Sequence, residues 1–436
     1  MKKTYKALLC GAAAVAAVGI AYAMDERFFE KAKDKLTVFK CRANSKIMEQ
    51  ALPLTDAMFP GPKVVSGADS AKKIPEVLKE LNVNKVMIVT GPTVGRTIVP
   101  PIAENLERHG IGYTIYDQVE ANPSVKTVEA IRAQYLENGC DGFLAIGGGS
   151  PMDAKAAAAR VAKPNTPIGK MAGMMKVMTK VAPIVAVPTT SGTGSEVTMG
   201  AVISDHDERH KYAIMDPNLV PKYAVLDPKL TVSMPKFVTV TTGIDALTHA
   251  VESYVTWAYN NNASNRNAEE AVVKIFRNLK RAYEDGNDLE AREAMLIASY
   301  KAGLAFNHTG VGYVHAIAHA MGGIYNTAHG LANAVIMPIV LEDYGTAVHP
   351  QLAHLAEITG VKTTGSDAEK ANAFIAAIRQ MNREMGLPTG FDFIEQKDFP
   401  QIIKWALAEG NGTYPVPVIY NEARMRHVLN RIVLEA

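Results

Sequence analysis

The sequence predicts two domains, an α/β domain built on a mostly parallel sheet and an all-helical domain that follows it. From about residue 62 to 230, short apolar runs alternate with amphipathic stretches, which is typical of β-α-β units with helices on both faces of a sheet. Beyond about residue 235 the strand signals fade and helical periodicity replaces them. The length of 436 residues also favours more than one hydrophobic core. We expect an N-terminal extension over 1–50, the α/β domain over 51–232 and the helical domain over 233–436.

The elements of the α/β domain follow one another in the order that a parallel sheet requires. Each predicted strand is a short apolar run, and each predicted helix ends at a glycine. The strands are expected at 85–91, 112–117, 142–147 and 183–190, and the helices at 97–110 and 125–139. In the second domain, helical periodicity covers 246–256, 267–285, 290–306, 314–325 and 369–386.

The composition is that of an ordinary globular protein. Hydrophobic residues make up 48%, charged residues 21%, and the net charge is +2, so neither a nucleic-acid-binding surface nor an acidic tail is indicated. The three cysteines, Cys10, Cys41 and Cys140, are far apart and form neither a disulfide framework nor a Cys-x-x-Cys metal pair. A metal site would therefore use nitrogen and oxygen ligands.

The N-terminus contains an apolar segment whose role the sequence leaves open. "MKKTYK" is basic, and residues 7–23 form an uncharged run that ends in an Ala-x-Ala pattern. This is typical of a cleaved secretory signal, of a short membrane anchor, or of a helix that does not insert. Basic residues are more numerous after the run than before it, which favours a cytoplasmic location with a membrane tether through 7–23.

Two glycine-bearing turns predict a site for phosphate groups. In "AIGGGSPMDAK", Ser150 suits a helix N-cap, Pro151 the first helical position and Asp153 a capping box. Glycine N–H groups and a helix N-terminus together bind a pyrophosphate. Met152 replaces the third glycine of the Rossmann fingerprint, and one such turn alone is compatible with simple strand-to-helix geometry. However, "PTTSGTGSE" (188–196) repeats the pattern after the next strand, which indicates a nucleotide site.

Histidines and an aspartate at helical spacing predict a metal site. Asp245 and His249 lie four residues apart, as do His315 and His319, and His329 follows after a glycine-bearing turn. Residues four apart share one face of a helix. A buried ion pair or packed core histidines would also explain the pattern. Three imidazoles and one carboxylate would suit a divalent metal such as Fe²⁺ or Zn²⁺.

Four segments together resemble the iron-containing (group III) alcohol dehydrogenases: "GGGSPMD", "PTTSGTGSE", "GIDALTHAVESY" and "HAIAHAMGGIYNTAHGLANAVIMP". The resemblance runs in matching order from about residue 52 to the C-terminus. It implies a dinucleotide-binding α/β domain facing a helical metal-binding catalytic domain, with the active site in the cleft between them and a homodimeric assembly. It also implies that His319 lies beside the nicotinamide without binding the metal. The implied metal ligands are Asp245, His249, His315 and His329, and the implied coenzyme contacts are Asn122, Gly148, Gly149, Ser150, Asp153, Thr189, Thr190 and Lys211.

One position departs from the family pattern. Many members have an aspartate after the "IVT" strand, where this chain has Gly91. An acidic group there would hydrogen-bond the ribose 2′-OH and repel a 2′-phosphate. We therefore expect NADP(H) to be accepted beside NAD(H), with Arg96 near enough to help. The alternative is a simple turn glycine.

The resemblance implies hydride transfer between a small primary alcohol, or its aldehyde, and the nicotinamide. The metal would polarise the substrate oxygen, and His319 would relay a proton or act only as a packed histidine. Alternatives are a glycerol dehydrogenase or a dehydroquinate synthase of the same architecture, and a non-catalytic metal-binding scaffold. The stretch "VGYVHAIAHAMGG" is nearly free of charge, which favours a small neutral substrate. The sequence does not choose between Fe²⁺ and Zn²⁺.

Overall fold

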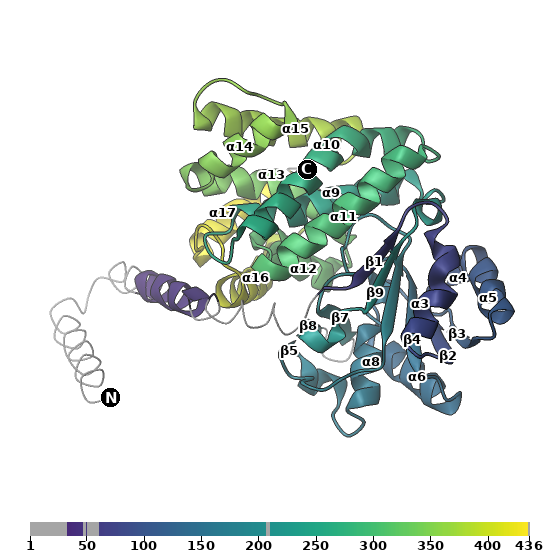
Figure 1. The fold of residues 1–436 in the computed structure, drawn as a ribbon. Coiled ribbons are helices and arrows are strands. Elements are labelled where there is room, and N and C mark those ends of the chain that lie inside the picture. The colour runs from purple at the N-terminus through teal and green to yellow at the C-terminus, as the bar shows by residue number, and fades with distance from the viewer. Residues whose placement is uncertain (1–32, 47–48, 50–60, 206–209, 435–436) are drawn as a thin grey trace.

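The computed structural model describes residues 33–46, 49, 61–205 and 210–434 (Figure 1). The apolar run over 7–23, and with it the prediction of a signal or an anchor, lies outside the described residues. Within those ranges, no helix combines the length and the apolar character needed to cross a bilayer.

A six-stranded sheet forms the centre of the α/β domain, and all of its strand pairs are parallel. The predicted fold class is confirmed. The carboxyl ends of parallel strands meet at one edge of a sheet, so the loops that follow β2, β3, β4 and β6 lie near one another. In spatial order the strands are β1 (Lys63–Ser66), β9 (Tyr223–Leu226), β6 (Ile184–Pro188), β4 (Gly142–Gly147), β2 (Lys85–Val89) and β3 (Gly112–Tyr116).

Helices cover both faces of this sheet because its strands alternate their apolar side chains between the two faces. On β2, Val86 and Ile88 join the core that includes α3 (Ile74–Glu80) and α5 (Val99–Arg108). The residues between them, Met87 and Val89, join the opposite core, which includes α6 (Val125–Glu137) and α8 (Lys155–Ala162). The central strands are therefore buried on both sides.

The helix expected over 97–110 is α5 (Val99–Arg108), and a short helix that was not expected, α4 (Pro92–Thr97), precedes it. Proline lacks an N–H and is favoured in the first turn of a helix, where no partner for that group is needed. Pro100 and Pro101 therefore require a new helix to begin just before them, and α5 begins at Val99.

A second, three-stranded sheet was not expected from the sequence. It contains β5 (Gly173–Met174), β8 (His210–Met215) and β7 (Gly200–Asp205), in that order. Strand β8 contacts α12 (Tyr313–Tyr325) of the helical domain. This small sheet thus contacts both domains, α12 through β8 and helices α6 and α8 through β7.

The helical domain packs around α9 (Lys236–Val255), in which most residues are buried. Helices α10 and α11 lie along α9, and α13 contacts it as well. The short helix η4 (Pro228–Thr231) precedes α9, and we propose the domain boundary here, at 232/233. The remaining helices are α10 (Asn262–Glu284), α11 (Leu289–Thr309), α13 (His329–Tyr344), α14 (His349–Thr359), α15 (Asp367–Glu384), α16 (Phe399–Thr413) and α17 (Glu422–Ile432).

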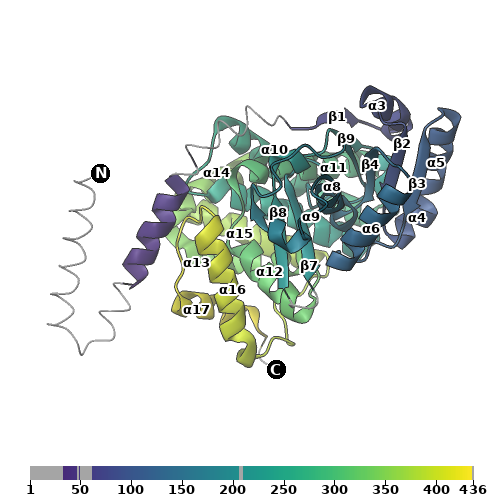
Figure 2. The same ribbon diagram turned by 90° about the horizontal axis from the view of Figure 1, so that it is seen from below.

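A further helix, over residues 33–46, lies outside both domains. Figures 1 and 2 show it beside the part of the helical domain formed by α16 and α17. It precedes the first strand of the sheet, yet it packs against helices from the C-terminal end of the chain.

Glycines allow the backbones of the two domains to touch. In the loop after β6, Gly194 has φ +59°, and a Cβ added there would lie 2.6 Å from the Cα of Gly303 in α11. A Cβ on Gly192 would lie 2.8 Å from the carbonyl oxygen of Thr242 in α9. Because no side chain fits at either position, this loop fixes the distance between the sheet and the helical domain.

We expect Gly194→Ala to lower the free energy of unfolding by about 2–4 kcal/mol, from the left-handed backbone and the close contact together. Gly200→Ala is the matched control, because a Cβ at Gly200 meets nothing within 4 Å. Urea unfolding of both variants would measure the effect. Equal stability of the two variants would contradict this account of the domain contact.

Candidate active site

Three helices bring one carboxylate and three imidazoles together. Asp245 and His249 lie one turn apart on α9, His315 lies on α12, and His329 is the first residue of α13. The ligand atoms of Asp245, His249 and His315 lie within 4.8 Å of one another, and all three residues are buried. His329 is half-buried, and its Nε2 lies 3.4 Å from Oδ1 of Asp245. This geometry could hold a metal ion.

Hydrogen bonds at Nδ1 orient two of these imidazoles. His315 Nδ1 lies 2.6 Å from Oε2 of Glu252, and His249 Nδ1 lies 3.3 Å from the carbonyl oxygen of Gly192. Both partners accept hydrogen bonds, so each Nδ1 carries a proton and Nε2 is the nitrogen left for a metal ion. Metal-binding histidines are usually held in this way. Glu252 also accepts a hydrogen bond from the backbone N–H of Val314 (2.8 Å).

The charges in the cluster fit a cation. Burial disfavours an ionised Asp245, but the neighbouring His249 and His329 more than offset this and hold its pKa far below the usual value. Burial lowers the pKa of His249 to about 3 and that of His329 well below its usual value. Burial also opposes a charged His315, but hydrogen bonds to Asp245 and Glu252 raise its pKa to about 9. Asp245 is therefore ionised and His249 and His329 are neutral, which are the forms that bind metals, whereas His315 would release a proton when a cation binds.

Asn333, on α13, is a part of the site that the sequence did not indicate. Its Nδ2 lies 2.8 Å from Oδ1 of Asp245, 3.3 Å from Nε2 of His315 and 3.1 Å from Nε2 of His329. Its Oδ1 is buried and has no hydrogen-bond partner within the described residues. Three acceptor atoms thus converge on one amide that has two hydrogens. A divalent cation would satisfy such a set of nitrogen and oxygen donors.

The two glycine-bearing turns lie side by side, as the sequence suggested. Thr189 N donates to the carbonyl oxygen of Gly147 (2.9 Å), because β4 and β6 are neighbours. A Cβ added to Gly148 would lie 3.2 Å from Oγ1 of Thr190, and one on Gly149 would lie 3.0 Å from Cγ2 of Thr193. Glycine is therefore needed for the two turns to approach each other.

The structure corrects the prediction that Ser150 is a helix N-cap and Asp153 a capping-box residue. The N-cap of α7 (Gly149–Met152) is Gly148 and not Ser150, and it has no side-chain cap. Ser150 instead accepts a hydrogen bond from the backbone N–H of Asn122 (3.2 Å). The carboxylate of Asp153 accepts a hydrogen bond from the backbone N–H of Val202 and so does not complete a capping box. The helix starts earlier than predicted because the glycine turn itself leads into it, which leaves Ser150 free to tie in the loop after β3.

A buried lysine that the sequence did not indicate, Lys155, is hydrogen-bonded to the loop that follows β6. Lys155 is 1% exposed. Its Nζ donates to the carbonyl oxygen and the hydroxyl of Ser195, both at 2.9 Å, and to the carbonyl oxygen of Thr198 (3.1 Å). Burial lowers the pKa of Lys155. Lys155 lies two residues after Asp153 and ties α8 to the loop that follows β6.

Lys211 lines a cavity of about 330 Å³ between β8, α12 and α16, together with His319, Trp405, Glu409 and Tyr414. The residues of the two glycine-bearing turns are not among those that line it. His319 Nδ1 lies 2.7 Å from Oε1 of Glu409, which also accepts a hydrogen bond from the Tyr414 hydroxyl. The His319 ring stacks on that of His329, with 5.0 Å between centroids. His319 therefore lies between the Asp/His cluster and a cavity of a size that suits a small molecule.

Gly91 is the N-cap of α4, at the end of β2, and Arg96 lies exposed on the same short helix. A Cβ at Gly91 would lie 3.2 Å from the carbonyl oxygen of Val119. The carboxylate of Asp117, at the end of the neighbouring strand β3, approaches this helix, with Oδ2 3.6 Å from a Cβ added to Gly95. A carboxylate is thus present near the loop, although not at the position where the family pattern has one.

Comparison with known proteins agrees with this architecture. The family described as iron-containing alcohol dehydrogenase matches residues 61–228, and its C-terminal domain matches residues 239–433. The chain is 36% identical to NAD-dependent methanol dehydrogenase of Bacillus methanolicus over 340 residues, covering 78% of this chain and 89% of the relative. It is 32% identical to lactaldehyde reductase of Escherichia coli strain K12, covering 78% and 90%. A crystal structure of 1,3-propanediol oxidoreductase superposes with a TM-score of 0.83 at 33% identity, covering 86% of this chain and 99% of the other.

The hydrogen bond between Glu252 and His315 should be needed for tight metal binding. In Glu252→Gln, the new amide would donate to Nδ1 of His315 and force the ring proton onto Nε2, where the metal should bind. We expect the affinity for Zn²⁺ to fall about 10–100-fold, as is usual when a partner of a metal-binding histidine is changed. Competition with a chelator would measure this affinity.

Glu269→Gln is the matched control, because Glu269 also contacts a histidine, His354, but lies outside the cluster. Unchanged affinity in Glu252→Gln, or an equal loss in both variants, would contradict the role given to Glu252.

Proposed function

The chain belongs to the iron-containing alcohol dehydrogenase family, and from this premise we propose that it transfers hydride reversibly between NAD(P) and a small primary alcohol or its aldehyde. It is an oxidoreductase that acts on CH–OH groups. The observation that carries the proposal is the buried Asp/His cluster, which adjoins a cavity through His319.

We propose Asp245, His249, His315 and His329 as the metal ligands and the turns at 147–150 and 189–193 as the coenzyme cradle. When bound, a divalent cation would polarise the substrate oxygen as a Lewis acid, and the nicotinamide would accept or supply the hydride. Iron is the metal named for the family, and Zn²⁺ would fit the same donors. The remaining chemistry belongs to residues of the chain.

His319 is the residue we propose for moving the proton. Its Nδ1 is held by Glu409, so Nε2 is the atom that would take the alcohol proton or return it to the carbonyl oxygen. Tyr414 holds Glu409 in turn. Since the His319 side chain is 31% exposed, the proton has a route to water.

The cavity favours a small, largely neutral substrate. Among the described residues that line it, Lys211 is the only lysine or arginine. The phosphate-bearing substrate of a dehydroquinate synthase would need several such groups. The relatives are named for methanol, 1,3-propanediol and lactaldehyde, which are all small and uncharged. A glycerol dehydrogenase remains the second candidate, because its substrate has the same size and neutrality.

The oligomeric state and the cellular location of the protein stay predictions. The homodimer implied by the family resemblance involves a second copy of the chain, and the cytoplasmic location depends on residues before 33. Analytical ultracentrifugation and fractionation of cells would test them separately from the chemistry.

The proposed reaction predicts aldehyde-dependent oxidation of NADH by the Fe²⁺-loaded protein. A panel of short aldehydes and the matching alcohols, each run with both coenzymes, would also separate a glycerol dehydrogenase from the favoured function. Removal of the metal with a chelator should abolish turnover, and Fe²⁺ or Zn²⁺ should restore it. Turnover that survives complete metal removal would contradict the proposal.

His319→Ala should lower kcat about 100-fold, the scale of a lost general acid–base group, while the metal content stays near one ion per chain. Metal analysis beside steady-state kinetics would check both expectations. If the variant loses its metal instead, His319 is a ligand and the proposed proton relay is wrong.

Gly91 and Asp117 should set the coenzyme preference, because a carboxylate at the adenosine ribose repels a 2′-phosphate. We expect Gly91→Asp to raise the ratio of kcat/KM for NADH over NADPH at least tenfold. Asp117→Asn, which keeps the side-chain size, should lower that ratio. If neither variant changes the ratio, the ribose is bound elsewhere.

A further inference from the structure

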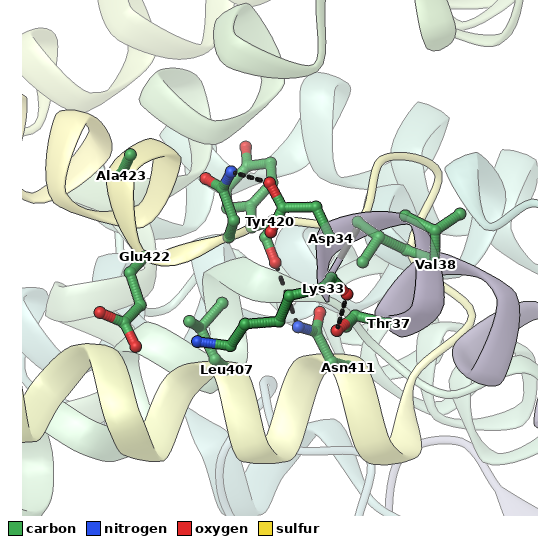
Figure 3. A pocket seen from close by; sticks show the side chains of 11 residues that line it. Lys33, Asp34, Thr37, Val38, Leu407, Asn411, Tyr420, Glu422 and Ala423 are labelled. Carbon is green, nitrogen blue, oxygen red and sulfur yellow. Dashed lines mark hydrogen bonds between the residues drawn. The ribbon is translucent and has the colours of Figure 1, made fainter. Parts of the chain in front are cut away.

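The helix over residues 33–46 docks on the helical domain through polar groups. Asp34 accepts a hydrogen bond from Nδ2 of Asn421 (2.8 Å). Arg42 donates to two backbone carbonyls in the segment 416–417 and lies over the ring of Trp257, 4.2 Å from its centroid. Figure 3 shows the first turns of this helix facing α16 and the segment before α17 across a hollow of about 220 Å³. The hydrogen bonds of the helix are thus made by its inward face, where Val38 also lines the hollow.

Its outward face is apolar. Leu36 is 53% exposed, and Phe39, at 70%, is the most exposed of the large hydrophobic side chains described. Residues three apart lie on the same side of a helix. At 100° per residue, Lys35 and Lys46 flank this pair on one side and Lys40 on the other, and all three lysines are exposed.

We propose that this outward face, defined by Leu36 and Phe39 with the flanking Lys35, Lys40 and Lys46, lies on the surface of an anionic lipid bilayer. An apolar stripe bordered by lysines is the pattern of helices that lie in the membrane interface. The side chains of Leu36 and Phe39 would enter the boundary between headgroups and acyl chains, and the lysines would extend to the lipid phosphates. The only acidic residue of 33–46 is Asp34, and its bond to Asn421 turns it away from this face.

The position of the helix in the chain supports a membrane rather than a second copy of the protein. Nine residues, 24–32, separate the uncharged run 7–23 from Lys33, and nine residues span at most about 30 Å. If that run enters a bilayer, the helix must lie close to it. The proposal does not depend on the reaction catalysed, so its failure would leave the proposed function unaffected.

Tryptophan fluorescence of the full chain would test the orientation. Phe39→Trp places a reporter on the outward face. Asn44→Trp, at another exposed position of the same helix, is the control for simple proximity to lipid. With vesicles of brominated phosphatidylcholine and phosphatidylglycerol, we expect the added emission of Phe39→Trp to be quenched at least twice as strongly as that of Asn44→Trp, with wild-type emission subtracted. Lys35→Glu combined with Lys40→Glu should remove this difference.

Three outcomes would overturn the proposal. Equal quenching at both positions, or none at either, would mean that the face does not enter the lipid. Emission of Phe39→Trp that shifts with protein concentration in the absence of vesicles would assign the face to a second copy of the chain.

Discussion

A carboxylate buried within a helix must be matched by positive charge, and this requirement governs the active site. Asp245 is 3% exposed, and its neighbours hold it ionised. Without a cation, its partners are the amide of Asn333 and the rings of His315 and His329. Removing an ion from water is costly unless such partners are complete. The cluster therefore makes chemical sense as a site that a divalent metal completes.

The Asp/His cluster and the proposed coenzyme cradle are parts of one arrangement because the loop after β6 contributes to both. The segment after β6 contributes Thr189 and Thr190 beside the glycine turn, and its Gly192 carbonyl oxygen orients His249. The close contact of Gly194 with Gly303 keeps this loop against the helical domain. A change in the distance between the domains would thus move His249 and the proposed coenzyme cradle together. The glycines of this loop keep that distance short, because side chains would not fit at their positions.

The sequence predicted what depends on local pattern and on spacing. Buried parallel strands, amphipathic helices and the pair Asp245/His249 all follow from periodicity. Glu252 lies three residues after His249 on the same helix, and Asn333 four after His329, so the same spacing argument could have found both. Glu409 could not have been found, because it reaches His319 from a helix 90 residues away in the chain. The pairing of β5 with β8 likewise joins segments that are distant in the chain.

The proposed chemistry requires that Asp245, His249, His315 and His329 share one cation. Diffraction from crystals grown with Fe²⁺ or Zn²⁺, collected at the absorption edge of that metal, would test it directly. We predict one anomalous peak about 2.0–2.2 Å from a carboxylate oxygen of Asp245 and from Nε2 of His249, His315 and His329. A peak elsewhere, or none in crystals whose protein retains the metal, would contradict the account.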